Sequence, residues 1–177
     1  RIECNDGLVG IEVPNDIRSV VPCRTIVTPD ICEKMQFGSL NIGMGVDIIG
    51  NPVKFNLAKA PHMLVAGQTG SGKSVFLNSL ICNLLMNNHP DEIELVLIDP
   101  KGTEMQAYSI LKTVKVINNV HDAVKKLASL VDVMEERYRM FTDATAKFGR
   151  PVRTLDDYME TVTDYSKDVN RRKRIVV

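Results

Sequence analysis

The stretch HMLVAGQTGSGKSVFLNSLICNLLM, at residues 62–86, decides the fold of this 177-residue chain. It begins with an apolar run, continues with a loop in which glycine recurs, and ends in a long segment of mainly apolar residues. This order predicts a strand at residues 62–66, then a tight loop, then a helix at residues 73–86. A strand before the glycines and a helix after them is the structural context that a phosphate-binding loop requires.

The loop itself, GQTGSGKS at residues 67–74, fits the pattern of glycine, four residues, glycine, lysine, and serine or threonine. Glycines let successive backbone N–H groups converge on phosphate oxygens with no Cβ in the way, and the following helix adds the positive end of its dipole. We therefore predict a nucleoside triphosphate site with Mg²⁺, in which Lys73 reaches the β- and γ-phosphates and the Ser74 hydroxyl completes the coordination of the metal. A glycine-rich turn of purely structural value is the alternative.

Lys73 and Ser74 are accordingly the predicted catalytic residues, and Ser74 is the predicted Mg²⁺ ligand. The nucleotide is expected to contact the loop and the first helical turn, namely Gly67, Gln68, Thr69, Gly70, Ser71, Gly72, Lys73, Ser74 and Val75. The loop binds phosphate through its backbone and does not read the base. The choice of ATP over GTP therefore follows only from the family resemblance described below.

The sequence after the loop predicts the rest of an α/β domain. A continuous apolar run at residues 93–98 and a shorter one at residues 114–117 read as strands of a parallel sheet. A helix is predicted at residues 120–141, with one apolar face made of Val124, Leu127, Val131, Met134, Tyr138 and Phe141. A capping box predicts a helix at residues 155–165, and a further strand starts at residues 175–177. The fold class is therefore α/β, with a mainly parallel sheet covered by helices on both faces.

The sequence before the loop predicts shorter elements. Residues 7–15 read as a short strand that a proline and an asparagine stop, and residues 29–36 as a short helix with proline at its first position. Residues 40–48 and 53–57 flank the turn cluster Gly-Asn-Pro and read as a hairpin. This hairpin is expected to open the main domain.

Composition limits the classes of partner. Lysine plus arginine and aspartate plus glutamate both number 22, so no overall field draws the chain to nucleic acid or membrane, and any DNA contact must be local. No apolar run has the length that a membrane span needs. The cysteines, Cys4, Cys23, Cys32 and Cys82, lack CxxC spacing, which favours buried free thiols and a reducing, cytoplasmic compartment.

Several polar residues resemble functional groups but allow plainer interpretations. Asp99 ends an apolar strand, as a Walker B aspartate does. However, this strand comes directly after the loop helix, whereas the Walker B strand of motor ATPases is a later one. Two roles stay open for Asp99: hydrogen bonding as a cap, or a place with Lys101 beside the nucleotide or a subunit interface. The basic run at residues 171–174 reads as a solvated loop, with contact to nucleic acid phosphates as the alternative. His62 reads as a satisfied core histidine.

Four segments resemble the FtsK/SpoIIIE family of DNA translocases in their order and spacing. They are GIEVPN at residues 10–15, MGVDIIG at 44–50, LAKAPHMLVAGQTGSGKSVFLNSL at 57–80 and LIDPK at 97–101. The segments MEERYRMF at 134–141 and VRTLDDYM at 152–159 resemble the helix and loop that follow in the family. The loop motif alone is shared by many unrelated proteins, so its coupling to the flanking segments carries the resemblance.

The resemblance implies a two-part motor that uses ATP and Mg²⁺. A small α subdomain would end near residue 38, so that residues 1–38 belong to it, and a RecA-like ATPase subdomain would occupy residues 39–177. The family assembles into hexameric rings around double-stranded DNA, in the cytoplasm, and a membrane anchor would lie outside this chain. The Walker B acidic pair of the family is expected just beyond Val177. The chain alone is therefore expected to bind nucleotide and to hydrolyse it poorly.

Departures from the family pattern keep other functions open. The sequence Gly-Thr-Glu at residues 102–104 is less apolar than in the chromosome translocases, and residues 142–170 form a longer segment, which is compatible with a mobile-element member. A conjugative coupling protein or a secretion ATPase would keep the motor and change the cargo. A small-molecule kinase would need an arginine-rich lid, which the sequence lacks. A nucleotide-binding module without turnover is the fourth alternative.

Overall fold

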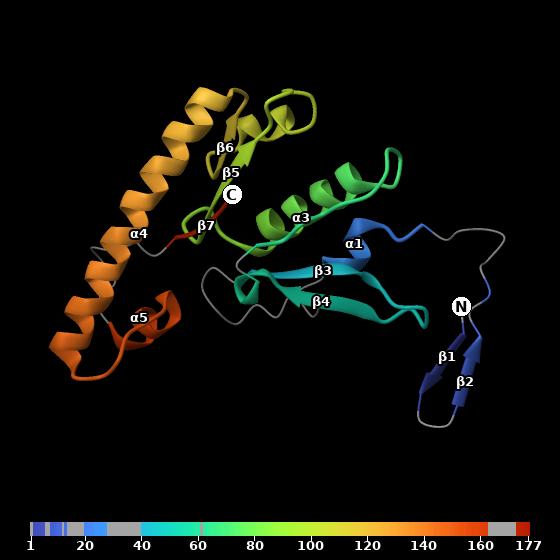
Figure 1. Ribbon diagram of the computed structural model, residues 1–177, viewed down its shortest axis with the longest axis horizontal. Coiled ribbons are helices and arrows are strands. Elements are labelled where there is room, and N and C mark those ends of the chain that lie inside the picture. Colours follow the sequence, from blue (N-terminus) through green and yellow to red (C-terminus); the bar gives the residue numbers. More distant parts are fainter. Residues whose placement is uncertain are drawn as a thin grey trace.

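The computed structural model describes residues 2–5, 8–11, 13, 20–27, 40–60, 62–162 and 173–177. Its centre is a three-stranded parallel sheet in the order β6-β5-β7 (Figure 1). The strands are β5 (Ile93–Ile98), β6 (Val114–Ile117) and β7 (Arg174–Val176). The parallel sheet that the apolar runs predict is therefore confirmed.

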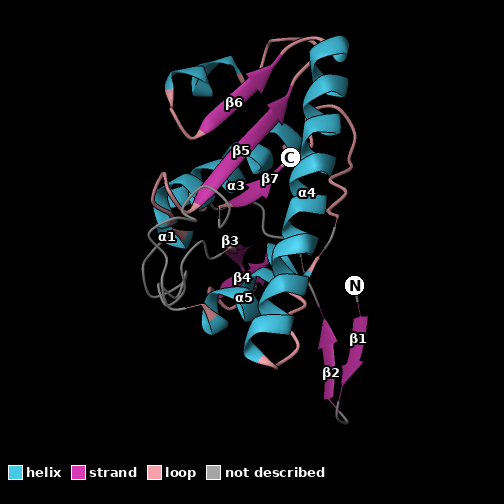
Figure 2. Ribbon diagram, turned by 90° about the vertical axis from the view of Figure 1, so that its left-hand side faces the viewer, coloured by secondary structure: helices cyan, strands magenta, loops and turns pink. Residues whose placement is uncertain are grey.

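Two helices cover this sheet, α3 (Lys73–Asn87) and α4 (Val120–Phe148). Side chains alternate between the faces of a strand, so β5 serves both helices. Its residue Leu95 joins a core cluster with the α3 residues Ile81 and Leu84, whereas Val96 packs with Ala123 of α4. Figure 2 shows the strands side by side with α4 running along the sheet. The predicted covering of both faces is confirmed.

A hairpin of β3 (Asn41–Val46) and β4 (Pro52–Asn56) packs on the opposite side of α3 from the sheet (Figure 1). Ile42 of β3 belongs to the same core cluster as Ile81 and Leu95, so α3 is the middle layer. The hairpin turn is organised by Asp47, whose carboxylate accepts hydrogen bonds from the backbone N–H groups of Ile49 and Asn51 at 2.9 and 2.8 Å. The hairpin was predicted, and its bounds differ from the prediction by one residue or two.

Close packing joins β3 to its neighbours. The N–H of Gly43 donates to the side-chain oxygen of Asn83, on α3, at 3.1 Å, and Asn83 is completely buried. A Cβ on Gly43 would lie 2.1 Å from the carbonyl oxygen of Ile26 in the short helix α1 (Cys23–Ile26). Only glycine fits between α1 and α3 at this point.

The strand predicted at residues 62–66, directly before the loop, is wrong. Residues 62–68 form no strand in the structure, and no ladder partner for them occurs in its described part. A strand is defined by hydrogen bonds to a neighbour, so apolar residues alone do not make one. His62, Met63 and Val65 instead line a cavity of about 470 Å³, which Ile175 and Val176 of β7 also line.

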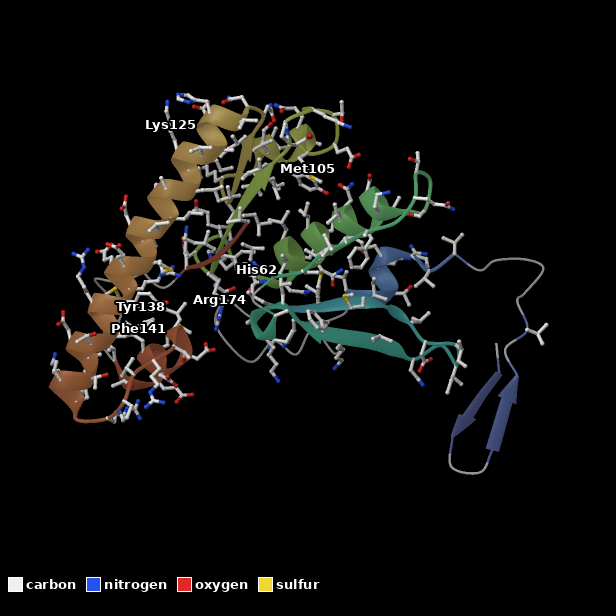
Figure 3. All side chains as sticks on the ribbon, viewed as in Figure 1. His62, Met105, Lys125, Tyr138, Phe141 and Arg174 are labelled. Atoms are coloured by element: carbon white, nitrogen blue, oxygen red, sulfur yellow. The ribbon has the colours of Figure 1, made fainter. Side chains whose placement is uncertain are left out.

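The predicted face of α4 exists but packs differently from a core face. Val124, Leu127, Val131 and Tyr138 are all exposed, Tyr138 by 59%. The side chains that face the protein lie one position away along the helix: Ala123, Lys126, Leu130, Val133, Arg137, Met140 and Ala144. Figure 3 labels Tyr138 and Phe141, of which Phe141 contacts the Tyr158 ring with centroids 6.0 Å apart. The helix therefore has an outer apolar stripe, which is mainly what the sequence pattern identified, and a separate inner face of mixed polarity that packs on the protein.

The remaining elements are small. In the N-terminal part, β1 (Ile2–Asn5) pairs antiparallel with β2 (Leu8–Ile11), which lies within the strand predicted at residues 7–15; part of that range lies outside the described residues. The helix α5 (Leu155–Thr161) begins at the predicted capping box of Thr154 and Asp157. Two 3₁₀ turns, η1 (Leu57–Lys59) and η2 (Gln106–Ile110), complete the described elements. The predicted helix at residues 29–36 lies outside the described residues. None of the described helices combines the length and apolar character that crossing a bilayer requires.

Candidate phosphate-binding site

Two glycines of the loop at residues 67–74 adopt backbone conformations that favour glycine. Gly70 and Gly72 have φ angles of 80° and 95°, in the left-handed region that favours glycine. A Cβ on Gly67 would lie 2.5 Å from the Ser71 hydroxyl oxygen, so a side chain there would fill the loop. The Ser71 N–H donates to the Gln68 carbonyl at 3.1 Å. The loop is thus a tight backbone turn that leads directly into α3.

Lys73 lies across this loop. Its Nζ donates to the carbonyl oxygens of Gly67 and Gln68 at 2.6 and 2.9 Å. The first turn of α3 contains no acidic residue, so nothing in that turn neutralises the positive end of the helix dipole. Weak carbonyl partners in place of a carboxylate leave the ammonium charge available to an anion at the loop.

Ser74 contacts a residue that the sequence did not place at the site. Its hydroxyl donates to the carboxylate of Glu104 at 2.9 Å, across 30 residues of sequence. Hydroxyl and carboxylate oxygens are ligands that Mg²⁺ prefers. Within the described ranges no three histidine, cysteine or acidic side chains form a ready-made metal cluster, so Mg²⁺ here would depend on Ser74 and on phosphate oxygens. The residues present fit a magnesium–nucleotide site.

Asp99 shapes the segment that presents Glu104. Its Oδ1 accepts from the backbone N–H groups of Lys101 and Gly102 at 3.2 and 3.1 Å. Its Oδ2 accepts from those of Glu104 and Met105 at 3.0 and 3.2 Å. These bonds, the one from Glu104 first, hold the pKa of Asp99 below its usual value. Of the two roles that the sequence left open, hydrogen bonding is the one the structure shows.

The far end of this segment is attached to α3. The Tyr108 hydroxyl, in η2, donates to the side-chain oxygen of Asn78 at 2.6 Å, and the Asn78 amide donates to the Ser74 carbonyl at 2.8 Å. Burial, followed by the neighbouring Cys82 thiol, raises the pKa of Tyr108 to about 12, so the hydroxyl keeps its proton. The side chain of Met105 packs against the main core cluster (Figure 3).

Other residues singled out by the sequence lie elsewhere. His62 is exposed, so its interpretation as a core histidine is wrong; it lies at the start of an irregular segment with only one side covered. Val75, in the first turn of α3, is 74% exposed. Arg174 belongs to β7 and pairs with Asp156 of α5, and its side chain is only 15% exposed, so its interpretation as part of a solvated loop is wrong. Residues 171–172 of the basic run lie outside the described part.

Sequence reasoning found the loop but missed Glu104, Asn78 and Tyr108. The loop is a local motif, whereas Glu104 and Asn78 bind Ser74 from the segment after β5 and from later in α3, and Tyr108 in turn binds Asn78. The one available signal was the departure Gly-Thr-Glu at residues 102–104 from the pattern of the chromosome translocases. This departure distinguished residues 102–104 from the family pattern, but it did not predict that Glu104 contacts Ser74.

Comparison with known proteins identifies related chains. The FtsK/SpoIIIE family profile matches residues 33–172. The DNA translocase FtsK of Staphylococcus epidermidis is 35% identical over 167 residues, which cover 93% of this chain and 20% of that protein. The DNA translocase FtsK of Helicobacter pylori is 37% identical over 155 residues, or 86% of this chain and 18% of that protein. The chain thus spans about one fifth of the length of these curated relatives.

Two solved structures share the fold. The conjugation coupling protein TcpA of pCW3, in monomer form with ATPγS, superposes with a TM-score of 0.59 and 27% identity over 88% of this chain and 39% of that one. The cytoplasmic domain of the type VII secretion ATPase EccC from Thermomonospora curvata superposes with a TM-score of 0.52 and 26% identity, over 71% of this chain and 15% of that one. These structures confirm the predicted fold class, and the family profile and the curated relatives confirm the family resemblance.

Proposed function

The chain belongs to the FtsK/SpoIIIE family, and on that premise we propose that it is the ATP-binding motor domain of a double-stranded DNA translocase. The observation that carries the proposal is the loop at residues 67–74. Its left-handed glycines, its lysine bonded to two loop carbonyls and its serine at the start of α3 form a cradle for a triphosphate. The naming of the relatives as DNA translocases supports DNA as the cargo.

The loop backbone, Lys73 and Ser74 have different roles in the proposed binding of the nucleotide. The backbone N–H groups of the loop and the positive end of α3 bind phosphate oxygens. Lys73 exchanges its two carbonyl partners for the β- and γ-phosphates, a charge-assisted pairing that is stronger than the bonds it replaces. Ser74 offers its hydroxyl oxygen to Mg²⁺, which when bound neutralises charge on the phosphates. Gln68, Thr69, Ser71 and Val75 complete the proposed contact surface.

The wider assembly is proposed from the family. We place residues 1–38 in a small N-terminal subdomain and residues 39–177 in the RecA-like ATPase subdomain, with six copies forming a ring around the duplex. The motor would work in the cytoplasm, with any membrane anchor outside this chain. ATP hydrolysis in the complete ring would move the DNA.

Turnover of ATP tests this proposal. The whole protein is assayed without DNA, with single-stranded DNA and with long double-stranded DNA, and Lys73→Ala serves as the blank. A translocase of duplex DNA should be stimulated strongly by the duplex and little by the single strand. Turnover that ignores both DNAs would contradict the proposal.

A second candidate is a conjugative coupling or secretion ATPase. The specific observation in its favour is the TM-score of 0.59 to the conjugation coupling protein TcpA over most of this chain. Such a motor would move a nucleoprotein or a polypeptide. ATP turnover that only a protein cargo stimulates would favour this candidate.

A further inference from the structure

Glu104 lies against the one side chain of the loop that is expected to bind metal. Its Oε1 accepts the hydrogen of the Ser74 hydroxyl at 2.9 Å. We infer that Glu104 is a positioning residue for Mg²⁺: it fixes the Ser74 hydroxyl so that the oxygen lone pairs face the metal. The inference rests on the proposed nucleotide site and extends it to a residue outside the loop motif.

The chemistry of a hydroxyl explains why an acceptor is needed. A serine hydroxyl has one hydrogen to donate and two lone pairs to offer. A divalent cation takes a lone pair and repels the hydrogen, so the hydrogen must point to an acceptor on another side. The Glu104 carboxylate supplies that acceptor, and its negative charge also favours a cation beside Ser74.

The segment that carries Glu104 is fixed at both ends. Asp99 binds the backbone N–H of Glu104 itself at 3.0 Å, together with three neighbouring N–H groups. On the other side, Tyr108 binds Asn78, and Asn78 binds the carbonyl of Ser74. The Glu104 backbone therefore needs little further ordering to meet Ser74. Because Glu104 is exposed, the contact itself gains little free energy, and a backbone that is already ordered lowers the entropy that forming it costs.

The arrangement also links two strand ends. Asp99 follows β5 directly, and its own N–H donates to the carbonyl of Ile117 at the end of β6 at 2.9 Å. The carboxyl edge of a parallel sheet is where open α/β folds bind ligands. Glu104 is thus presented to α3 from the edge at which a nucleotide is expected.

Metal affinity and nucleotide affinity can be measured separately. The chain is titrated with ATPγS in EDTA and in Mg²⁺ by calorimetry, and Mn²⁺ binding to the complex with ATPγS is followed by electron paramagnetic resonance. The variants are Glu104→Ala, which removes the acceptor, and Glu104→Gln, which keeps an acceptor oxygen without the charge. Glu160→Ala is the matched control, because Glu160 is an exposed acid on α5, remote from the loop. Lys73→Ala tests the site as a whole.

Glu104→Ala should weaken Mn²⁺ binding by about 10- to 100-fold, as is typical when the partner of a metal-ligating group is removed. Its ATPγS affinity in EDTA should stay within about twofold of wild type. Glu104→Gln should recover part of the loss, which a merely structural role would not predict. Glu160→Ala should match the wild type in both solutions.

Two different results would overturn the inference, and they have different meanings. Mn²⁺ affinity in Glu104→Ala within about twofold of wild type, with ATPγS still bound, would refute the role of Glu104 and leave the nucleotide site standing. Failure of the wild type to bind ATPγS in either solution would refute the nucleotide site together with the inference. Thermal unfolding of each variant checks that it remains folded.

Discussion

At the scale of single residues, Asp99 determines the shape of the segment between β5 and η2. Its carboxylate accepts four backbone hydrogen bonds within seven residues of chain. Each of these bonds favours the ionised carboxylate, which is why the pKa of Asp99 is lowered. The residue therefore acts on the site through the backbone of Glu104.

Replacing Asp99 should make stability depend less on pH. The pKa of Asp99 is lower in the folded chain than its ordinary value of 3.8, so the carboxylate stabilises the fold above that value and the contribution is lost as the pH falls through the folded pKa. Asp99→Asn should lower the free energy of unfolding at pH 7, and the gap to wild type should narrow toward pH 3 in urea titrations. Asp132→Asn, on the exposed side of α4, is the control. A gap of equal size at both pH values would contradict the role assigned to ionised Asp99.

Lys73 is the residue on which nucleotide affinity should depend most. Lys73→Ala removes the cation that the loop offers to the β- and γ-phosphates, and we expect tight ATP binding to be abolished in calorimetry. Lys112→Ala makes the same change at an exposed lysine between η2 and β6 and should retain binding. Unchanged affinity in Lys73→Ala would refute the assigned role.

At the scale of elements, α3 holds the hairpin by a buried polar contact as well as by apolar packing. Asn83 accepts from the Gly43 N–H and donates to the Ser79 carbonyl at 2.9 Å. A buried N–H without a partner is costly, so this one side chain matches α3 to β3. The β-bulge between Gly43 and Gly45 marks the same point of β3.

Replacing Asn83 should therefore destabilise the fold although the new residue is apolar. Asn83→Leu leaves the Gly43 N–H buried without an acceptor and should cost about 1–3 kcal/mol in the free energy of unfolding, measured with urea. Asn87→Leu is a matched control on the same helix, because the buried Asn87 amide nitrogen has no partner among the described residues. It should be neutral or slightly stabilising. Equal losses for both variants would show that size, and not the hydrogen bond, determines the effect.

Elements with a strong local pattern could be predicted from the sequence, and those defined by a neighbour could not. The helix at residues 73–86 and the strand at residues 93–98 have periodicity and flanking signals, and both were found nearly to the residue. Residues 62–66 have an apolar pattern but no ladder partner in the described part. The site shows the same division: the motif placed Lys73 and Ser74 at the loop, whereas Glu104 reaches it only through the fold.

At the scale of the whole molecule, one core cluster joins three layers. Ile42 from the hairpin, Leu84 from α3 and Leu95 from the sheet belong to the same cluster, and each is about 1% exposed. Loss of packing in α3, the middle layer, should therefore destabilise both the hairpin and the sheet. The outer stripe of α4, by contrast, contributes little to this core, because its side chains are largely exposed.

Truncation at the two kinds of position should differ in size. Leu84→Ala should cost about 2–5 kcal/mol, because it leaves a cavity in a closely packed core. Leu127→Ala, at a site 45% exposed on the outer stripe of α4, should cost less than about 1 kcal/mol. Urea unfolding followed by circular dichroism gives both values. Equal costs would mean that the outer stripe is buried in solution.

The position of α3 makes ligand binding visible in the melting behaviour of the entire domain. The helix begins at the loop and its body forms the middle layer, so the loop has no independent unfolding step. By mass action, a ligand at 100 times its Kd adds about 2.7 kcal/mol to the free energy of unfolding of the cooperative unit that contains its site. ATP should therefore raise a single melting temperature, and a rise confined to one of two transitions would show that the layers melt separately. A thermal-shift screen of nucleotides thus becomes a direct assay of which base the protein selects.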